Sequence, residues 1–238
     1  MTAIINPPLT QWLPVVGNER VVYDIRTFLQ SLPAFQILDV SFLPVDHQSP
    51  FIAGQGIKLR YSYIIHPEGD PSKKYNEGLR RNLREAAPRY TIAASSDITL
   101  FLSLCRQTYE HRGMKPPGWF DHIIPKIIRE LTSRNAGALE MAVDGKGQAI
   151  AGILTGYDHA RHYYIAGGKM SDDSGISAHA LLLDHAVRRA AGEGRIFDFE
   201  GSMHPGIANF FQSFGARPEA YWNIRKYRGA GKLWALFH

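Results

Sequence analysis

The feature that most constrains how this chain can fold is a change in the spacing of its apolar residues at residue 138. The spacing becomes two over three consecutive segments, 138–143, 149–157 and 161–166. The turn sequences Asp144-Gly145-Lys146-Gly147 and Asp158-His159-Ala160 separate these segments. A period of two indicates strands, and turns this short join antiparallel neighbours. The sequence therefore predicts a three-strand antiparallel meander.

Helices and further strands are expected on both sides of the meander. Spacings of three and four indicate helices, and Asp97 and Pro205 stand where an N-cap and a first helical residue belong. The predicted helices run from Asn18 to Pro33, over 73–87, from 97 to 109, over 123–131, over 178–191 and from 205 to 214. The other predicted strands are 36–43, 57–65, 90–93, 196–199, 221–227 and 233–237.

Composition narrows the class of protein. Of the 238 residues, 45% are hydrophobic and 21% are charged, which suits a globular core and excludes a disordered or fibrous chain. Cys105 is the single cysteine, so no intramolecular disulfide can form and a cysteine-based zinc site is not expected. Apolar runs stay below the roughly 20 residues that cross a bilayer, and the first residues lack a signal-peptide pattern. We therefore expect a cytoplasmic protein without a membrane span.

The order meander, helix, strand, helix, strands resembles the second half of the GNAT acyltransferase fold. Three segments are similar to the FemAB-like branch of that superfamily: YDHARHYYIAGG at 157–168, FDFEGS at 197–202 and GIANFFQSFGA at 206–216. This branch includes aminoacyl-tRNA-dependent peptidyltransferases and acetyltransferase-like proteins. The segment LRRNLREA at 79–86 also resembles the basic helix that joins the two halves of such proteins.

The resemblance implies a fold class and a domain organisation. The fold class is α/β (α+β), with a GNAT-like mixed, mostly antiparallel sheet flanked by helices. Peptidyltransferases of the branch carry two GNAT-like domains, for which 238 residues leave too little chain. We therefore expect an abbreviated N-terminal GNAT-like region at 1–90, ending in the basic helix, and a GNAT-like acyltransferase domain at 91–238.

The resemblance also implies a site for the acyl donor. Acetyl-CoA-dependent members hold the pyrophosphate on a glycine-rich loop and the helix N-terminus that follows it. Here that place reads GGKMSDDSGIS over 167–177, which has the glycines and a lysine but not the usual spacing, and two adjacent aspartates would repel phosphate. The expected donor is acyl-CoA, such as acetyl-CoA, used as a co-substrate. Its expected ligands are Gly167, Gly168, Lys169, Gly175 and Ser177.

Acyl transfer to an amine needs a group that accepts a proton and a donor to the developing oxyanion. Asp198 and Glu200 stand two apart in the predicted strand, so both should point to the same side. Either carboxylate could deprotonate the amine, and His204 follows them in the next turn. Alternatively, the carboxylates pair with Arg195 or another arginine, and Ser202 or His204 simply caps the helix at 205.

The resemblance to the GNAT fold also implies that the loop between the two predicted helices, 97–109 and 123–131, lines the acceptor. It is rich in Pro and Gly and cannot be helical, although it could also be a plain connector. The expected acceptor ligands are Arg112, Lys115, Trp119, Tyr164 and Ser202. His159 and His162 lie in a hairpin, where their side chains would not converge, so no metal site is expected.

These residues predict an N-acyltransferase that moves an acyl or aminoacyl group from acyl-CoA to an amine of a small molecule or peptide. The attack would be direct, because no activated nucleophile is visible. In one alternative the donor is aminoacyl-tRNA, held by Arg80, Arg81 and Arg84, which could instead form a solvated helix face. In another, the chain is a non-catalytic module that binds a ligand or partner. The net charge of +5 suits an anionic ligand, and 233–237 could be an edge strand of a homodimer.

Overall fold

A computed structural model describes residues 2–11, 30–42, 56–170, 173–201, 203–230 and 232. Contacts divide the chain into two compact units, one of Met1–Ser62 with Glu219–His238 and one of Tyr63–Pro218. The helix predicted after Asn18 and the strand predicted at 233–237 lie outside the described residues. The expected division into 1–90 and 91–238 stays a prediction. Each unit is described below by itself.

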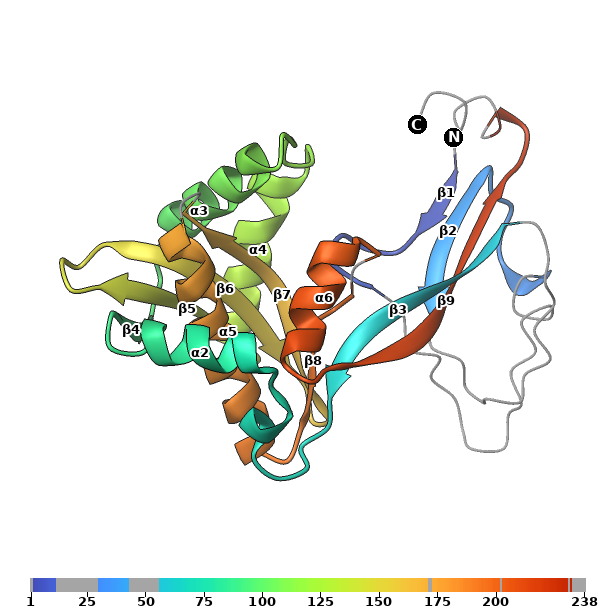
Figure 1. Cartoon of the computed structure of the whole chain (residues 1–238). Helices are drawn as coiled ribbons and strands as arrows, with labels where there is room; N and C mark the ends of the chain where they lie inside the picture. The colour runs from blue at the N-terminus through green and yellow to red at the C-terminus, as the bar shows by residue number, and fades with distance from the viewer. Residues whose placement is uncertain are drawn as a thin grey trace. The chain divides into compact units, whose positions relative to one another are not determined.

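The first unit is built on strands from both ends of the chain (Figure 1). Strand β1 (Ala3–Ile5) pairs in parallel with β2 (Ile37–Phe42), which pairs antiparallel with β9 (Arg217–Tyr227), and β3 (Ile57–Ile65) lies next to β9. Leu38, Val40 and Ile224 pack with Phe35 in a small buried core. The predicted strands at 36–43, 57–65 and 221–227 are therefore confirmed.

The second unit contains the predicted meander. Strands β5 (Gly137–Asp144), β6 (Ala149–Tyr157) and β7 (Arg161–Lys169) pair antiparallel in sequence order, and β4 (Tyr90–Ala94) pairs antiparallel with β5. On the other side, β8 (Ile196–Asp198) pairs in parallel with β7 and antiparallel with the end of β3. The expected fold class, a mixed and mostly antiparallel sheet flanked by helices, is confirmed.

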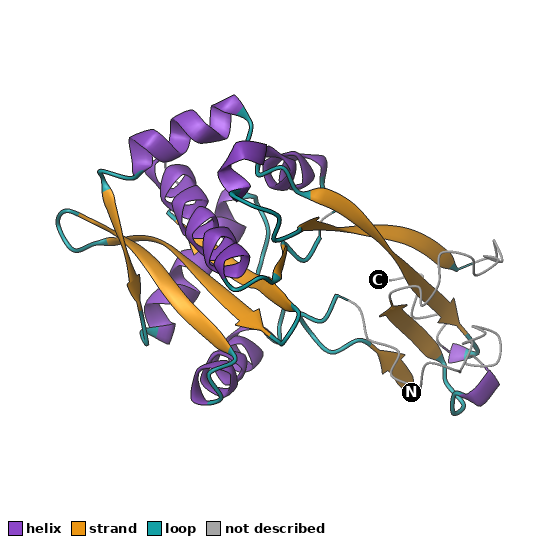
Figure 2. Ribbon diagram, turned by 90° about the horizontal axis from the view of Figure 1, so that it is seen from below, coloured by secondary structure: helices purple, strands orange, loops and turns teal. Residues whose placement is uncertain are grey.

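Helices cover both faces of this sheet (Figure 1, Figure 2). On one face, α3 (Ile98–His111) packs on β6 and β7, and α4 (Phe120–Ser133) packs on β5. On the other face, α5 (Asp173–Gly192) crosses β5 to β8, and α2 (Glu77–Ala86) packs against α5. Every side chain of β6 from Ile150 to Gly156 is buried because both faces are covered. Within the described part of the chain, no helix combines the length and apolarity that a membrane span needs.

Local signals in the sequence explain where the helices begin. Asp97 caps α3 by accepting from the backbone N–H of Leu100 at 2.9 Å, as predicted. The predicted helix at 73–87 is instead a short 3₁₀ helix, η1 (Pro71–Lys74), followed by α2. Asn76 interrupts the two because its side chain accepts from Leu79 N–H at 2.8 Å and starts α2 anew. Helix α6 (Pro205–Ser213) begins at proline as predicted.

Two segments differ from the predicted elements in ways that matter for the site. Gly167–Lys169, expected as a loop, continue strand β7 and pair with β6. Strand β8 ends at Asp198, and Glu200 has a φ of 62°, so the expectation that Asp198 and Glu200 share one strand face is wrong. Helix α5 also begins earlier than expected, at Asp173 rather than 178.

Candidate active site

Strands β7 and β8 pair only at the start of β7. Arg161–Tyr163 oppose Ile196–Asp198, whereas β7 continues to Lys169 along β6 alone. The register between β6 and β7 shifts here, because Leu154 opposes Ala166 and Thr155 opposes Tyr164, which leaves Ile165 as an extra residue. A bulge of this kind bends a strand and increases its twist. It follows that the edge of β7 beyond Tyr163 is not paired with β8.

The backbone of β7 presents hydrogen-bond donors along this outer edge. Met170 N–H donates to Ile150 C=O on β6 at 2.9 Å. Because antiparallel ladders alternate, the N–H of Gly168 also faces β6, while the N–H groups of Lys169 and Gly167 face outward. Lys169 N–H donates to Thr108 Oγ1 on α3 at 2.9 Å. The Gly167 N–H is thus placed on the outer edge of the strand.

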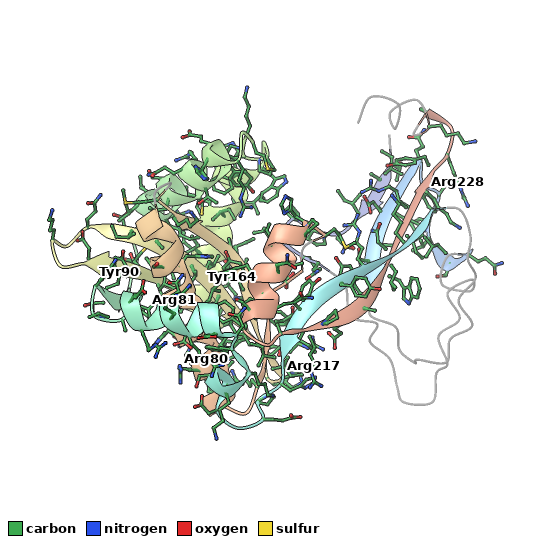
Figure 3. All side chains as sticks on the ribbon, in the orientation of Figure 1. Arg80, Arg81, Tyr90, Tyr164, Arg217 and Arg228 are labelled. Carbon is green, nitrogen blue, oxygen red and sulfur yellow. The ribbon has the colours of Figure 1, made fainter. Side chains whose placement is uncertain are left out.

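A tyrosine and a histidine meet beside this edge. Tyr164 of β7, labelled in Figure 3, places its hydroxyl 3.1 Å from Nε2 of His179 on α5. The His179 ring stacks on Phe210 of α6 with centroids 6.1 Å apart. Phe211 of the same helix meets Tyr164 edge-to-face at 6.3 Å. Strand, helix and aromatic rings therefore fix the geometry of the pair, while both side chains stay partly exposed.

The surroundings keep both members of the pair uncharged at neutral pH. Burial lowers the pKa of His179 to about 4, and the positive charges of Lys169 and Arg112 act in the same direction. Burial raises the pKa of the Tyr164 hydroxyl well above its ordinary value. The pair therefore combines a protonated hydroxyl with a neutral imidazole. Such a pair can donate a hydrogen bond to a developing oxyanion.

His179 was not among the residues predicted from the sequence. It lies in a predicted helix whose apolar residues are sufficient to predict that helix. No local sequence pattern pairs it with Tyr164. Gly167 is the residue in the sequence that could have indicated the pair. A Cβ at this position would lie 2.6 Å from His179 Nε2 and would also overlap the Tyr164 hydroxyl. The glycine therefore allows the pair to form against the strand.

The expected donor ligands lie on two elements. Gly167, Gly168 and Lys169 belong to β7, whereas Gly175 and Ser177 belong to the first turns of α5. A Cβ at Gly168 would lie 2.5 Å from the carbonyl carbon of Leu104 and would overlap the backbone nitrogen of Cys105, both on α3. Close packing of α3 on the strand thus accounts for Gly168. Contact between these five residues and a donor stays a prediction.

Gly168→Ala is expected to destabilise the fold because its methyl group would meet backbone atoms of α3 that cannot rotate away. We expect the free energy of unfolding to fall by about 2–3 kcal/mol, at the upper end for overpacked interiors. Gly145→Ala is the matched control, since nothing lies within 4 Å of a Cβ at that turn position. Urea unfolding measures both variants, and equal stabilities would contradict the close packing of α3 on β7.

The predicted catalytic residues surround the end of β8. Asp198 is fully buried, and its carboxylate accepts from Arg161 Nη1 at 3.1 Å and from Glu200 N–H at 2.8 Å. This is the alternative pairing with an arginine, although the partner is Arg161 rather than Arg195. Glu200 is partly exposed, and His204 occupies the N-cap position of α6 without a capping hydrogen bond from its side chain. A catalytic role for these three residues stays a prediction.

The predicted acceptor residues differ in how close they lie to the Tyr164–His179 pair. Arg112 ends α3 and lies within electrostatic reach of both Tyr164 and His179. Lys115 is exposed, and Trp119 is partly exposed at the start of α4. Ser202 lies outside the described residues. The structure therefore groups Tyr164, Arg112 and Lys169 around His179.

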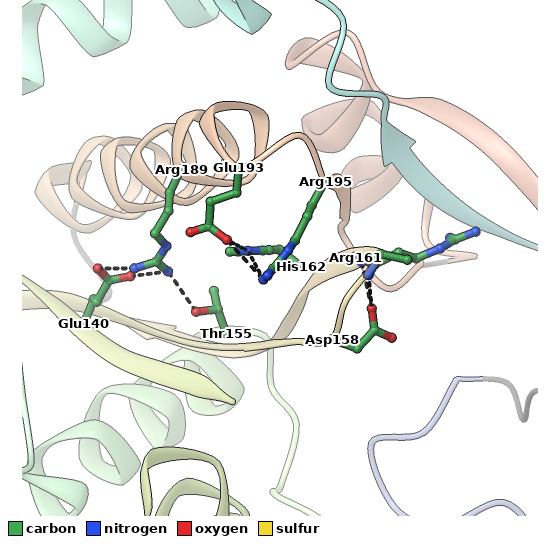
Figure 4. Close-up of polar contacts among 9 residues, drawn as sticks. Glu140, Thr155, Asp158, Arg161, His162, Arg189, Glu193 and Arg195 are labelled. Carbon is green, nitrogen blue, oxygen red and sulfur yellow. Dashed lines mark hydrogen bonds and ion pairs between the residues drawn. The ribbon is translucent and has the colours of Figure 1, made fainter. Parts of the chain in front are cut away.

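A buried polar network fastens α5 to the sheet (Figure 4). Arg189 of α5 makes two hydrogen bonds to Glu140 of β5, at 3.0 and 3.1 Å, and a third to Thr155 Oγ1 at 3.2 Å. Directly after the end of α5, Glu193 accepts from His162 Nε2 of β7 at 2.9 Å. These bonds span the helix on the side that faces the sheet. They hold α5, and with it His179, in register with β7.

Among the residues that the structure describes, His, Cys, Asp and Glu nowhere gather in a group of three that could hold a metal ion. His162 stacks on Tyr157 with centroids 5.0 Å apart, and its side chain is fully buried. Its ring therefore contacts Tyr157, the Glu193 carboxylate and, at 3.4 Å, the Arg195 guanidinium.

Two histidines, fully buried His162 and partly buried His179, make the stability of the fold depend on pH. Burial lowers the pKa of His179 to about 4, and it lowers that of His162 against the opposing effect of Glu193. Unfolded histidines bind protons near pH ~6.5. As the pH falls below that value, the unfolded state binds protons first, so the free energy of unfolding decreases until the folded histidines also titrate.

For His179 we expect a loss of up to about 3 kcal/mol between neutral pH and pH ~4. His179→Gln should remove this part of the pH dependence, whereas exposed His111→Gln should follow the unchanged protein. Denaturant unfolding at a series of pH values measures the difference. An unaltered pH profile in the His179 variant would contradict its burial as a neutral ring.

The comparisons with known proteins agree with this fold. The family profile described as "Acetyltransferase (GNAT) domain" matches residues 72–210. The crystal structure of FemX is similar, with a TM-score of 0.62 and 14% identity over 83% of this chain and 74% of FemX. L-PGS from Bacillus licheniformis has a TM-score of 0.57 and 12% identity over 81% of this chain and 69% of its own. No curated protein sequence matches the chain significantly.

The family match covers more than half of the chain, including β7, α5 and the start of α6. The two solved structures are 14% and 12% identical to this chain, so the likeness to them is one of fold. The chain therefore belongs to the GNAT acetyltransferase-domain family, with the fold of its FemAB-like branch.

Proposed function

We propose that this protein transfers an acyl group from acyl-CoA to an amine of a small molecule or peptide at the Tyr164–His179 pair. The observation that carries the proposal is the outer edge of β7, which leaves β8 after Tyr163 and runs past the neutral pair. A donor on that edge would have its reacting carbonyl beside a protonated hydroxyl. The family match supports acyl transfer as the reaction class.

The donor would bind as an added strand. The amide-bearing arm of CoA is extended, so it can pair with outward-facing backbone groups of β7 such as the Gly167 N–H. The strand leads into α5, whose first N–H groups lack helical partners and favour an anion. The phosphates of CoA would therefore lie beyond Lys169, near Gly175 and Ser177 at the start of α5.

Each residue of the site has a proposed part in the reaction. The amine nitrogen attacks the thioester carbonyl, and the oxygen that becomes negative accepts a hydrogen bond from Tyr164. A His179 tautomer with its proton on Nε2 donates to the Tyr164 oxygen and leaves the hydroxyl proton free to point at the substrate. The C–S bond then breaks and releases CoA. Arg112 attracts an anionic part of either substrate.

The proton lost by the amine needs an acceptor. Glu200 is the proposed base, because it is partly exposed and follows Phe199, whose ring stacks on Phe211 at 4.7 Å. Phe211 also contacts Tyr164. Asp198 is proposed to orient Glu200 instead, since it accepts from the Glu200 N–H.

Calorimetric titration with acetyl-CoA tests the donor. We expect saturable heat and a rise in the midpoint of thermal unfolding, since a ligand that binds only the folded state stabilises it. CoA without the acyl group should also bind, because most of the proposed contacts involve its arm and phosphates. Neither heat nor thermal shift at millimolar acetyl-CoA would contradict acyl-CoA as the donor.

Aminoacyl-tRNA is the alternative donor, and one observation favours it. Arg80, Arg81 and Arg84 of α2 are exposed, and no ion pair joins them to another residue in the described ranges. Figure 3 shows Arg80 and Arg81 on this helix. Retention of tRNA that weakens steeply with salt and requires all three arginines would support this donor. Retention of tRNA that does not change with salt concentration, or no retention, would contradict aminoacyl-tRNA as the donor.

A further inference from the structure

A cavity lies between α2 and α5, with a volume of about 620 Å³. Its walls include Tyr75, Arg80 and Arg84 from the α2 side and Leu181, Asp184 and Arg188 from α5. This volume falls within the range of small-molecule sites.

The cavity is separate from the Tyr164–His179 pair. An α-helix turns by about 100° per residue, so Leu181, Asp184 and Arg188 lie roughly 140–200° around α5 from His179. His179 faces β7, whereas the three cavity residues face α2, which packs against α5. A ligand in this cavity would therefore bind on the opposite side of α5 from the proposed reaction.

The charges in the cavity favour an anion. Asp184 pairs with Arg188, whose Nε lies 2.9 and 3.0 Å from its two carboxylate oxygens and whose Nη1 lies 3.5 Å from Asp70. Arg80 and Arg84 are four apart on α2, so they lie on one face, and neither is in an ion pair with a described residue. Glu77 is the other carboxylate in the wall, at the first position of the helix. The wall therefore holds three arginines and two carboxylates, and Arg80 and Arg84 are the two arginines left to contact an anion.

A buried hydroxyl adds a second, independent observation. Tyr75 is 2% exposed, and its hydroxyl lies beside the Asp184 carboxylate in the wall of the cavity. Its ring is held edge-to-face against Phe214 at 5.3 Å. Burial, then the charge of Asp184 and a hydrogen bond to it, raise the pKa of this hydroxyl, so it keeps its proton. Because Arg188 already occupies both oxygens of Asp184, a ligand acceptor in the cavity would compete for the hydroxyl proton.

We propose that the cavity between α2 and α5 binds a small phosphorylated molecule, with the phosphate contacted by Arg80 and Arg84 and a second acceptor bonded by the Tyr75 hydroxyl. Two guanidinium groups one helical turn apart can each bind different oxygens of one phosphate. A carboxylate ligand has only two oxygens and suits this pair less well. A small ligand fits better than an RNA backbone because Arg81, equally exposed on α2, does not line the cavity.

The test compares two arginines of α2 that line the cavity with one that does not. Inorganic pyrophosphate is titrated into the full chain, the double variant Arg80→Gln/Arg84→Gln, Tyr75→Phe and the control Arg81→Gln. We expect the double variant and Tyr75→Phe to weaken binding by about 10-fold or more, and Arg81→Gln to leave it unchanged.

Three results would overturn the proposal. Pyrophosphate binding that is absent, or that is retained in the double variant, would exclude this cavity as its site. Equal weakening by Arg81→Gln would indicate the general charge of α2. Binding of a short single-stranded RNA, but not of pyrophosphate, that requires Arg81 would assign α2 to nucleic acid. Acetyl-CoA binding measured in the same double variant keeps the two sites distinguishable, because the donor site uses none of these residues.

Discussion

Tyr164→Phe is expected to lower kcat/KM for acyl transfer by about 100-fold while leaving the affinity for acetyl-CoA nearly unchanged. Removal of one preorganised donor to an oxyanion typically costs a factor of this size in rate. The donor molecule is held mainly by the backbone of β7 and the start of α5 in our proposal, so its binding should survive. Phenylalanine retains the ring contact with Phe211, which keeps the site in shape.

Tyr163→Phe is the matched control for this experiment. Tyr163 precedes Tyr164 on the same strand, but its hydroxyl donates to Asp158 in the turn before β7, at 2.9 Å. We expect it to change the rate less than about 3-fold, since its hydroxyl lies outside the proposed site. Similar rates in both variants and in the unchanged protein would contradict the role of the Tyr164 hydroxyl. If Glu200→Gln also had no effect, a non-catalytic binding module would be favoured.

Arg189→Met is expected to lower the free energy of unfolding by about 3–4 kcal/mol, because it leaves the buried carboxylate of Glu140 without its main partner. His185 at 3.4 Å remains near one carboxylate oxygen and offsets a part of the loss. For a chain of this size the midpoint of thermal unfolding should fall by roughly 6–16 °C. The same variant should reduce activity near its new midpoint, since Arg189 helps hold α5 on the sheet.

Arg134→Met provides the comparison. Arg134 and Glu130 form an ion pair at 3.0 Å on α4, but their side chains are 74% and 66% exposed. Exposed pairs of this kind contribute about 0.3–0.5 kcal/mol. Calorimetric unfolding of both variants measures the contrast. Equal shifts in the two variants would contradict a stabilising role for the Glu140–Arg189 pair.

The sequence predicted the order of elements well because local signals determine most of them. The meander follows from two short turns and a spacing of two, and Asp97 and Pro205 correctly indicated two helix starts. The break at Asn76 was missed because capping competes with helix continuation, and the periodicity of α2 extends past it. The length of β7 was missed because glycine pairs usually end strands, whereas Gly168 here is required by the close approach of α3.

The site was predicted less completely because its parts come together only in the folded chain. Tyr164 and Arg112 were among the expected acceptor ligands, and the structure brings them near His179, which the sequence did not suggest. The Tyr164–His179 bond depends on a bulge at Ile165 and on the absence of a side chain at Gly167. The pairing of Asp198 with Arg161 likewise joins residues 37 apart in the sequence. No local pattern specifies such contacts.

Hydrogen exchange of the full chain with and without saturating acetyl-CoA tests the central claim most directly. If the donor pairs with the outer edge of β7 beside Tyr164 and His179, amide exchange should slow in peptides covering Tyr164–Met170. The edge strand β4, which is separated from β7 by β6 and β5, should be unaffected. Acetyl-CoA that binds without slowing exchange anywhere in Tyr164–Met170 would contradict the account.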